Sequence, residues 1–322
     1  MATIPTDRVL LGTWPTPMES APRLAAAIGL GAADLWLKRD DLTGLAGGGN
    51  KIRKLEWTVA AAVADDADTL ITTGAPQSNH ARLTAAAATR LGLDAVLVFP
   101  GEPPPDASGN LLLDAILGAT VVWAGEASAD QAAAATAERL RGEGRRPAII
   151  PFGGSDGVGA HGYRLAGQEI AEQAADVRHV VCAVGSGGTM AGLVAALGAT
   201  RVLGVHTGAV PDPRAQVGGL LADMGEQTPA TELRIRNDQV GSGYGSVAPQ
   251  ATSALRLAAR TEGLVLDPTY TARAMAGLIA EIRDGTIAPG ETVVFLASGG
   301  LPGLFGHPAA AELATAAADA GS

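Results

Sequence analysis

A lysine follows a run of glycines in the first sixth of the chain. The glycines at 47–49 precede Asn50 and Lys51, and a helical pattern begins directly after them. Glycine lets the backbone turn freely and approach a ligand closely. A lysine held at such a turn, if its amine is neutral when it attacks, can form a Schiff base with a carbonyl compound. Lys51 is therefore a candidate for covalent catalysis. A solvated lysine at a helix start is the alternative, and the neighbouring Arg53 and Lys54 are interpreted as surface charges of the helix.

A second glycine-rich turn follows the apolar run 179–184 and leads into another helical segment. Its residues are Gly185, Ser186, Gly187, Gly188 and Thr189. The start of a helix presents free N–H groups and the positive end of the helix dipole, which together favour an anion. The turn lacks the Gly-Lys-Ser/Thr of a Walker loop and the Gly-x-Gly-x-x-Gly spacing of dinucleotide sites. The pattern favours a phosphate monoester over a nucleotide.

Further polar side chains stand where apolar runs end. Ser78, Asn79 and His80 follow the run 69–73, and Ser298 follows the run 292–297. Ser78 or Asn79 could serve as a helix cap, but one cap would suffice, so we expect a binding site here. Ser298 is equally suited to capping and to facing a ligand.

Two of the three tyrosines, Tyr244 and Tyr270, lie in turn-forming segments where exposure is natural. No His, Cys, Asp or Glu cluster has the spacing of zinc ligands, so no metal site is expected.

The candidate residues can form one site only in a fold that brings the ends of several strands close together. Short apolar runs alternate with alanine-rich helical segments, which predicts an α/β fold with mainly parallel sheets flanked by helices. Ligands of such sheets bind at the carboxyl ends of the strands. The predicted strands are 34–38, 69–73, 95–99, 120–123, 148–151, 179–184, 201–207 and 292–297. The predicted helices are 54–64, 80–91, 109–117, 129–143, 159–174, 190–197, 247–262 and 271–283. The segment 211–240 gives the weakest pattern.

Composition narrows the class of protein. The chain has 322 residues, of which 47% are hydrophobic and 17% charged. This composition predicts a folded protein, and this length predicts more than one hydrophobic core of ordinary size. The net charge of −10 argues against nucleic acid or an anionic membrane as partner. The single cysteine, Cys182, lies in an apolar run and is interpreted as a buried strand thiol. Without a secretory signal pattern or a long apolar stretch, we expect a soluble, cytoplasmic protein.

A catalytic lysine beside a phosphate site suggests pyridoxal 5′-phosphate as cofactor, and four motifs carry a resemblance that agrees. In order along the chain they are Gly48–Glu56, Gln77–His80, Gly185–Thr189 and Asp267–Thr271. They resemble the D-cysteine desulfhydrase and 1-aminocyclopropane-1-carboxylate deaminase family, which are fold-type II pyridoxal phosphate enzymes similar to the tryptophan synthase β chain. The resemblance implies a large cofactor-binding domain of residues 1–50 and 158–322 and a small domain of residues 51–157. It also implies an active site in the cleft between them, and a homodimer.

The resemblance assigns roles to the residues of the motifs. Lys51 would bond covalently to the cofactor and carry the substrate's α-proton, and Ser78, Tyr244 and Tyr270 would complete the catalytic set. The cofactor-binding set would be Lys51, Asn50, Asn79, Gly185, Ser186, Gly187, Gly188, Thr189 and Ser298. Asn79 would bind the ring oxygen O3′ and Ser298 would face the ring nitrogen. The small amino-acid substrate would meet Ser78, Asn79, His80 and Thr271.

Within the family, the motifs favour one branch. The resemblance implies that ring-opening deaminases carry Tyr-Glu at the late motif, where this chain has Tyr270 and Thr271. They tend to carry Ser-Asn-Gln where this chain has Ser78, Asn79 and His80. This favours α,β-elimination of D-cysteine, or a related β-substituted amino acid, to pyruvate, ammonia and sulfide. Ala297 and Ser298 depart from the His-Thr of desulfhydrases, so three alternatives stay open: cyclopropane deaminase, cysteate-type sulfolyase, and a non-catalytic protein that binds pyridoxal phosphate or an amino acid.

Overall fold

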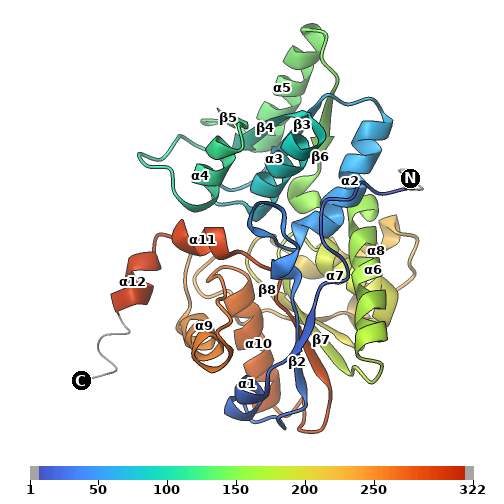
Figure 1. Ribbon diagram of the computed structural model, residues 1–322, viewed down its shortest axis with the longest axis vertical. Coiled ribbons are helices and arrows are strands. Elements are labelled where there is room, and N and C mark those ends of the chain that lie inside the picture. Colours follow the sequence, from blue (N-terminus) through green and yellow to red (C-terminus); the bar gives the residue numbers. More distant parts are fainter. Residues whose placement is uncertain (1–6, 316–322) are drawn as a thin grey trace.

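The computed structural model describes residues 7–315, which form two sheets flanked by helices (Figure 1). The larger sheet is parallel except for its first strand, which is antiparallel to its neighbour. In spatial order its strands are β1 (Met18–Ser20), β2 (Leu35–Lys38), β10 (Val293–Leu296), β7 (His179–Val184), β8 (Val202–His206) and β9 (Arg234–Arg236). The predicted α/β class is confirmed.

Helices cover both faces of the larger sheet. Val180 and Cys182 of β7 point to one face and Val181 to the other, and each face packs its own hydrophobic core. The first face carries α6 (Gly157–Gln173), α7 (Gly188–Leu197) and α8 (Pro213–Asp223). The second carries α1 (Pro22–Ala27), α9 (Pro249–Glu262) and α10 (Thr271–Arg283). Cys182 is fully buried, as predicted, and burial raises the pKa of its thiol to about 12.

The smaller sheet is parallel throughout. Its strands, in spatial order, are β5 (Thr120–Trp123), β4 (Asp94–Phe99), β3 (Thr69–Thr73) and β6 (Pro147–Ile150). One face packs against α2 (Lys51–Ala64), α3 (Asn79–Leu91) and α4 (Gly109–Ile116), and the other against α5 (Ala129–Gly142). All four strands come from residues 69–150, whereas those of the larger sheet come from 18–38 and 179–296. Each sheet is therefore built from its own part of the chain, the smaller one from a single continuous segment.

Helix α2 packs between the smaller sheet and α6, a helix that covers the larger sheet (Figure 1). Its side chains Ile52, Leu55 and Val59 enter the core of the smaller sheet, while the helix also packs against α6. A Cβ atom at Gly162 of α6 would lie 2.0 Å from the carbonyl oxygen of Arg53, so glycine permits this close approach. Residues on both sides of α2 are consequently buried.

The structure corrects the sequence reading in several segments. Helix α2 begins at Lys51, three residues earlier than predicted, because the glycine turn ends at once in helical backbone. The weak segment 211–240 contains α8 and β9. A pair of glycines, Gly218 and Gly219, interrupts the apolar pattern of α8, and β9 is a short edge strand. Among the described residues, the prediction also lacks the short strand β1, the short α-helices α1, α11 (Leu301–Phe305) and α12 (Ala310–Thr315), and several 3₁₀ turns.

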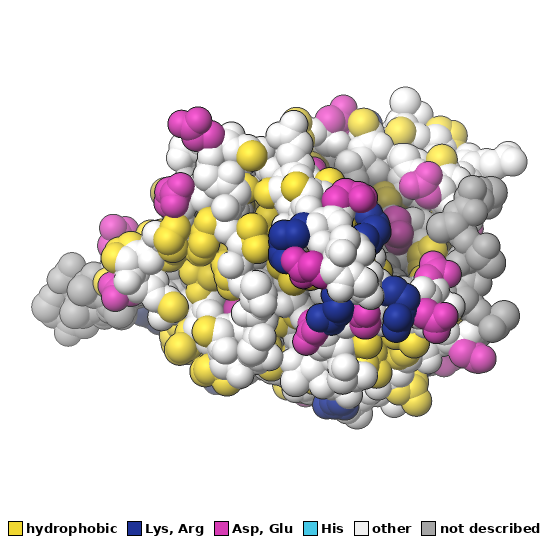
Figure 2. Space-filling view, turned by 90° about the horizontal axis from the view of Figure 1, so that it is seen from above, with side chains coloured by type: hydrophobic (Ala, Val, Ile, Leu, Met, Phe, Trp, Pro, Cys, Tyr) yellow, Lys and Arg dark blue, Asp and Glu magenta, His cyan; other side chains and the backbone are white. Residues whose placement is uncertain are grey.

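The surface seen from above, over the smaller sheet, carries mixed charge (Figure 2). Acidic side chains stand among the lysine and arginine side chains that this view shows. On α5, for example, Arg139 pairs with Glu143 and Arg141 pairs with Glu138. Within residues 7–315, no helix is both long enough and apolar enough to cross a membrane.

Candidate active site

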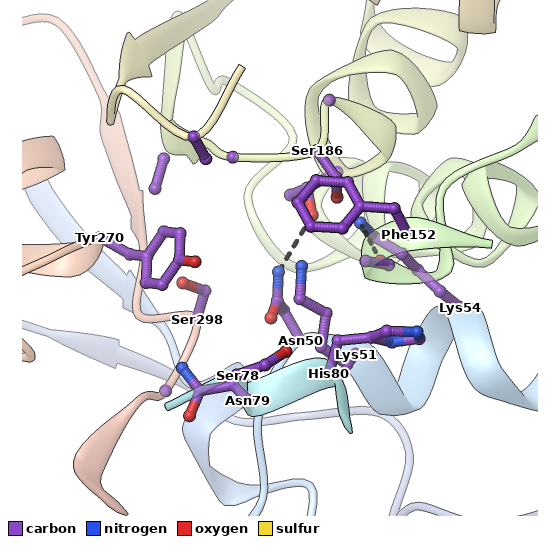
Figure 3. Close-up of a pocket in the computed structure, with 17 residues that line it drawn as sticks. Asn50, Lys51, Lys54, Ser78, Asn79, His80, Phe152, Ser186, Tyr270 and Ser298 are labelled. Atoms are coloured by element: carbon purple, nitrogen blue, oxygen red, sulfur yellow. Dashed lines mark hydrogen bonds between the residues drawn. The ribbon is translucent and has the colours of Figure 1, made fainter. Parts of the chain in front are cut away.

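One pocket lies where the carboxyl ends of both sheets meet (Figure 3). Loops that follow β3, β6, β7 and β10 line it together with the first turn of α2. Its polar and aromatic lining residues are Asn50, Lys51, Lys54, Ser78, Asn79, His80, Phe152, Ser186, Thr189, Tyr270 and Ser298. The pocket therefore lies at the carboxyl ends of the strands, where ligands of parallel sheets are expected to bind.

The glycine turn places Lys51 at the first position of α2. Gly47, Gly48 and Gly49 all have positive φ (86°, 67° and 128°), and a Cβ at Gly48 would lie 2.1 Å from the carbonyl oxygen of Asp41. Larger residues would be strained there. Two guanidinium N–H groups of Arg82 hold this turn by donating to the carbonyl oxygens of Ala46 and Gly48, at 2.7 and 3.0 Å.

The Lys51 side chain points into the pocket between Asn50 and Phe152 (Figure 3). Burial lowers the pKa of its amine from 10.5 to about 8. A larger fraction of the amine is therefore neutral near pH 7 than for a surface lysine, and the neutral amine is the nucleophile.

Lys54 and Arg53 are not surface charges, which corrects the prediction. Only 1% of Lys54 is exposed, and its ammonium group donates to Ser155 Oγ at 2.9 Å and to the Gly153 carbonyl oxygen at 3.2 Å. Burial and the neighbouring Lys51 hold the pKa of Lys54 well below its ordinary value. The sequence pattern of α2 gives no sign that α6 covers its second side, so it could not reveal this burial.

Arg53 is also buried, and it pairs with two carboxylates. Its guanidinium group donates to both oxygens of Asp40, at 2.8 and 2.9 Å, and to Glu169. The Tyr163 hydroxyl donates to Asp40 as well. Burial opposes ionisation of Asp40, but the Arg53 charge outweighs it and holds the pKa of the carboxyl below its ordinary range. The cluster joins α2 to α6 and to the segment before α2.

The turn 185–189 forms a cradle at the start of α7. Gly187 has φ +88°, and α7 begins at Gly188, whose N–H donates to Ser155 Oγ at 3.3 Å. Ser155 Oγ lies 2.7 Å from Ser186 Oγ and also accepts from Lys54. The other N–H groups of the first turn have no intrahelical partner. The Lys54 amine, two serine hydroxyls and a helix start are thus gathered around one point, which suits a phosphate group.

Thr189 and Asn50 close the other side of the cradle. The Asn50 amide donates to Thr189 Oγ1 at 3.1 Å, and the Asn50 backbone N–H donates to the Ser298 carbonyl oxygen at 2.9 Å (Figure 3). Ser298 itself lines the pocket and is 9% exposed. The structure therefore brings three predicted cofactor-binding residues to the same pocket as Lys51.

The loop after β3 supplies three more of the predicted residues. Ser78 both caps α3, accepting from the Ala81 N–H at 3.1 Å, and lines the pocket. Asn79 lines it beside Ser78. His80 lines it as well, but it is only 2% exposed and its Nε2 is bonded to Thr72 Oγ1 at 2.9 Å. Burial, with the nearby Lys51 and Lys54 charges, holds the pKa of His80 well below its ordinary value.

The two tyrosines form a pair at the edge of the pocket. Their hydroxyl groups are 2.5 Å apart and their rings meet edge to face, with centroids 6.0 Å apart. Tyr270 lines the pocket, whereas Tyr244 lines an adjoining groove that Tyr270 and Asn79 share. Burial, then Tyr244, raises the pKa of Tyr270 well above its ordinary value, so the hydroxyl keeps its proton at neutral pH.

Among the predicted site residues, Gly188, Tyr244 and Thr271 do not line the pocket, and of these Thr271 is turned away from it. It is 1% exposed, and its hydroxyl donates to Asp267 Oδ1 at 2.7 Å. Its position at the start of α10 turns the side chain toward Asp267, so Thr271 shapes the loop that carries Tyr270. Direct contact with a substrate, as the resemblance implied, is not supported.

Sequence reasoning missed Lys54, Ser155 and Phe152. Phe152 and Ser155 follow β6, so the strand-end rule applied to that strand could have found them. Lys54 lies one helical turn after Lys51, on the same side of α2. That spacing could have identified Lys54 as a site residue in the sequence.

Comparison with known proteins gives the same class of enzyme. The model of the family described as pyridoxal-phosphate dependent enzyme matches residues 9–299. The chain belongs to this family, and its cofactor is pyridoxal 5′-phosphate. The donors described above fit that group, because an amine faces the pocket and a phosphate cradle lies beside it.

The chain is similar to two Pyrococcus proteins and to two solved structures. A protein of Pyrococcus furiosus and one of Pyrococcus abyssi, both named "Putative 1-aminocyclopropane-1-carboxylate deaminase", are 39% identical to it; each alignment covers 92% of this chain and 93% of the relative. A crystal structure titled as an ACC deaminase homologue has a TM-score of 0.87 at 35% identity over 96% of both chains. A threonine deaminase from Solanum lycopersicum (TM-score 0.64, 22% identity, 88% of this chain and 79% of that chain) shares the fold. The fold-type II architecture is thereby confirmed.

Proposed function

We propose that this enzyme catalyses α,β-elimination from D-cysteine or a related β-substituted amino acid, giving pyruvate, ammonia and, from cysteine, sulfide. One observation carries the proposal: Lys51, Ser78 and Tyr270 line one pocket to which, within residues 7–315, no aspartate or glutamate contributes. The amine and the hydroxyl groups must then perform the proton transfers. The bound cofactor supplies a carbonyl carbon for Lys51 and an electron-withdrawing ring that acidifies the substrate's α-C–H bond.

The residues around the pocket divide the remaining work. Lys54, Ser186 and the start of α7 would bind the phosphate, and Asn79 and Ser298 would contact the ring. Lys51, with its lowered pKa, is suited to accept the α-proton once a substrate amine has taken its place. A positioned base of this kind contributes roughly a hundredfold to ten-thousandfold in rate. Ser78 would bind the substrate carboxylate or pass on a proton.

The tyrosine pair is placed to protonate a leaving group. Tyr270 keeps its proton, and Tyr244 connects it to the adjoining groove. Sulfide leaves more easily as a protonated species, so a neutral hydroxyl at this edge of the pocket suits elimination. Acting as a pair, the two hydroxyl groups can pass one proton along a 2.5 Å hydrogen bond.

The charge around the groove favours a substrate with an uncharged side chain. Its lining includes Glu102, Asp106 and Asp267 and, among the described residues, no lysine or arginine. Its one histidine, His307, has its pKa lowered by burial. A sulfonate side chain would meet carboxylates here, which argues against a cysteate-type sulfolyase.

Cyclopropane deamination is the second candidate, since the relatives named above bear that name. A single panel separates the possibilities: purified enzyme with D-cysteine, L-cysteine, β-chloro-D-alanine, L-cysteate and 1-aminocyclopropane-1-carboxylate. Sulfide and pyruvate from cysteine support the proposal, and 2-oxobutyrate from the cyclopropane substrate alone overturns it in favour of the deaminase.

Lys51→Ala is the required control for every activity in the panel. The variant should fold, lose the yellow colour of the lysine-bound cofactor, and lose turnover. Turnover at the wild-type rate by this variant would contradict the role of Lys51. A yellow wild-type protein that turns over no member of the panel would favour the non-catalytic binding protein.

A further inference from the structure

Asn110, a residue of α4 outside the pocket lining, holds the side chain of Asn79 by a hydrogen bond. Asn110 is fully buried. Its Nδ2 donates to the backbone carbonyl oxygen of Gln77 at 2.9 Å and to Asn79 Oδ1 at 3.0 Å. We propose that Asn110 is a positioning residue, which fixes the amide of Asn79 with its nitrogen toward the cofactor.

The orientation of both amides follows from one backbone atom. The carbonyl oxygen of Gln77 can only accept a hydrogen bond, so the group of Asn110 that faces it must be the NH₂. That same NH₂ faces Asn79, so Asn79 must present its oxygen in return. Rotating either amide would set two acceptors or two donors against each other. The amide nitrogen of Asn79 is thereby left on the opposite side.

That opposite side is the pocket. Figure 3 shows the nitrogen of Asn79 toward Ser298 and Tyr270 and the oxygen away from them. The oxygen side instead faces α11, where a Cβ at Gly303 would lie 3.9 Å from Asn79 Oδ1 and 3.5 Å from Asn110 Nδ2. Within residues 7–315, Asn79 Nδ2 has no hydrogen-bond partner, so its two donors are free for a ligand.

Gln77 locks Asn110 in place from a second direction. Gln77 Oε1 accepts from the Asn110 backbone N–H at 2.9 Å, and Gln77 Nε2 donates to the Ser108 carbonyl oxygen at 3.0 Å. A Cβ at Gly109 would lie 2.5 Å from Gln77 Oε1, so glycine is needed where the side chain crosses the start of α4. The loop after β3 and the start of α4 are thus fastened together, and Asn79 cannot turn without breaking this arrangement.

The consequence is chemical, and it rests on the proposed role of Asn79 toward the ring oxygen of the cofactor. A fixed donor stabilises the ionised form of that oxygen, whereas an amide free to turn could present its acceptor oxygen instead. A hydrogen bond to a charged group changes affinity by roughly tenfold to a hundredfold. Asn110 would keep the Asn79 amide in its donor orientation without touching the cofactor.

Asn110→Asp tests the inference, because it replaces the donor with a second acceptor while keeping the size of the side chain. The dissociation constant for pyridoxal phosphate should rise about tenfold or more. The absorption band of the bound cofactor should shift in the direction seen in Asn79→Ala. Asn110→Ala, which merely frees Asn79, should give a smaller effect in the same direction and replaces the aspartate variant if that fails to fold.

A double-mutant cycle separates positioning from structural support. In the Asn79→Ala background, Asn110→Asp should cause no further change in the dissociation constant or the spectrum. Gln77→Leu keeps the backbone carbonyl oxygen that orients the two amides and removes only the side-chain fastening, so it should lower the melting temperature and shift the absorption band less than Asn110→Asp does. A wild-type spectrum and affinity for Asn110→Asp would overturn the inference, as would an equal effect in both backgrounds. These readouts need no substrate, so they stand apart from the outcome of the substrate panel.

Discussion

Lys51 and Lys54 lie one turn apart on α2 and both line the same pocket. Burial lowers the pKa of each amine, and the Lys51 charge lowers that of Lys54 further. Lys54 is held by Ser155, whereas Lys51 points to the open centre of the pocket. Two buried amines this close repel each other when both are protonated. The bound cofactor would relieve this repulsion, because its phosphate would bind Lys54 and its carbonyl carbon would bond to Lys51.

The burial of Lys51 predicts how the stability of the cofactor-free protein depends on pH. The amine loses its proton near pH 8 in the folded state and near 10.5 in the unfolded chain. Between these values the unfolded chain holds more protons, so the free energy of unfolding rises with pH, in total by about 3 kcal/mol. Urea unfolding of the cofactor-free protein from pH 7.5 to 10.5 should show this rise.

Lys51→Met supplies the matched control for that measurement. The variant keeps the length of the side chain and removes the titrating group, so its profile over the same pH range should be flatter. It should also be more stable than the wild type at pH 7.5. Identical slopes for the two proteins would show that Lys51 is not responsible.

The cradle predicts that a single methyl group at Gly188 weakens cofactor binding. A Cβ there would lie 2.6 Å from Ser155 Oγ and 3.2 Å from Lys54 Nζ. Gly188→Ala should displace both groups from the phosphate site and raise the dissociation constant for pyridoxal phosphate roughly tenfold or more. Gly219→Ala in α8 is the control, because nothing lies within 4 Å of its Cβ position. Equal affinity of the two variants would contradict the assignment of the cradle.

Much of the site could be predicted because it follows a local rule. Ser78, Asn79 and the turn 185–189 each stand directly after an apolar run, and parallel strands bring such ends together. Lys51 could be singled out because glycines precede it. Each of these signals lies within a few residues of the side chain concerned.

The remaining residues depend on contacts between distant segments, which the sequence pattern does not contain. Arg53 and Lys54 look exposed on α2 taken alone, and they are buried only because α6 packs against its second side. Asn110 acts through a loop more than thirty residues earlier. Thr271 follows Tyr270 directly, yet the start of α10 turns its hydroxyl to Asp267 instead of the pocket.

The buried ion pair of Arg53 predicts a large loss of stability on its removal. Arg53→Met would leave Asp40 fully buried and without its cation. Removing one partner of such a pair costs about 3–5 kcal/mol. Arg53→Lys should recover only part of this, because an ammonium group cannot bond both oxygens of Asp40 and Glu169 in the same geometry.

Arg139→Met is the comparison for Arg53→Met, since Arg139 makes an exposed pair with Glu143 on α5. Its loss should change the free energy of unfolding by less than about 1 kcal/mol. Urea unfolding of the holoenzyme at neutral pH measures all three variants. A cost for Arg53→Met as small as that for Arg139→Met would refute the structural role of the cluster.

Thr271→Glu tests whether the residue after Tyr270 faces the substrate or Asp267. In the structure a glutamate there would enter a buried site beside the Asp267 carboxylate, whose pKa burial already raises. The two carboxylates would share a proton, so the folded state would bind more protons than the unfolded chain, and stability would fall as pH rises from 5 to 8. Thr271→Gln, of equal size and uncharged, should show no such fall in stability between pH 5 and 8.

At pH 8 the glutamate variant should be less stable than the glutamine variant by about 3 kcal/mol in urea unfolding. Equal stability at pH 8, together with new formation of 2-oxobutyrate, would instead place position 271 in the pocket.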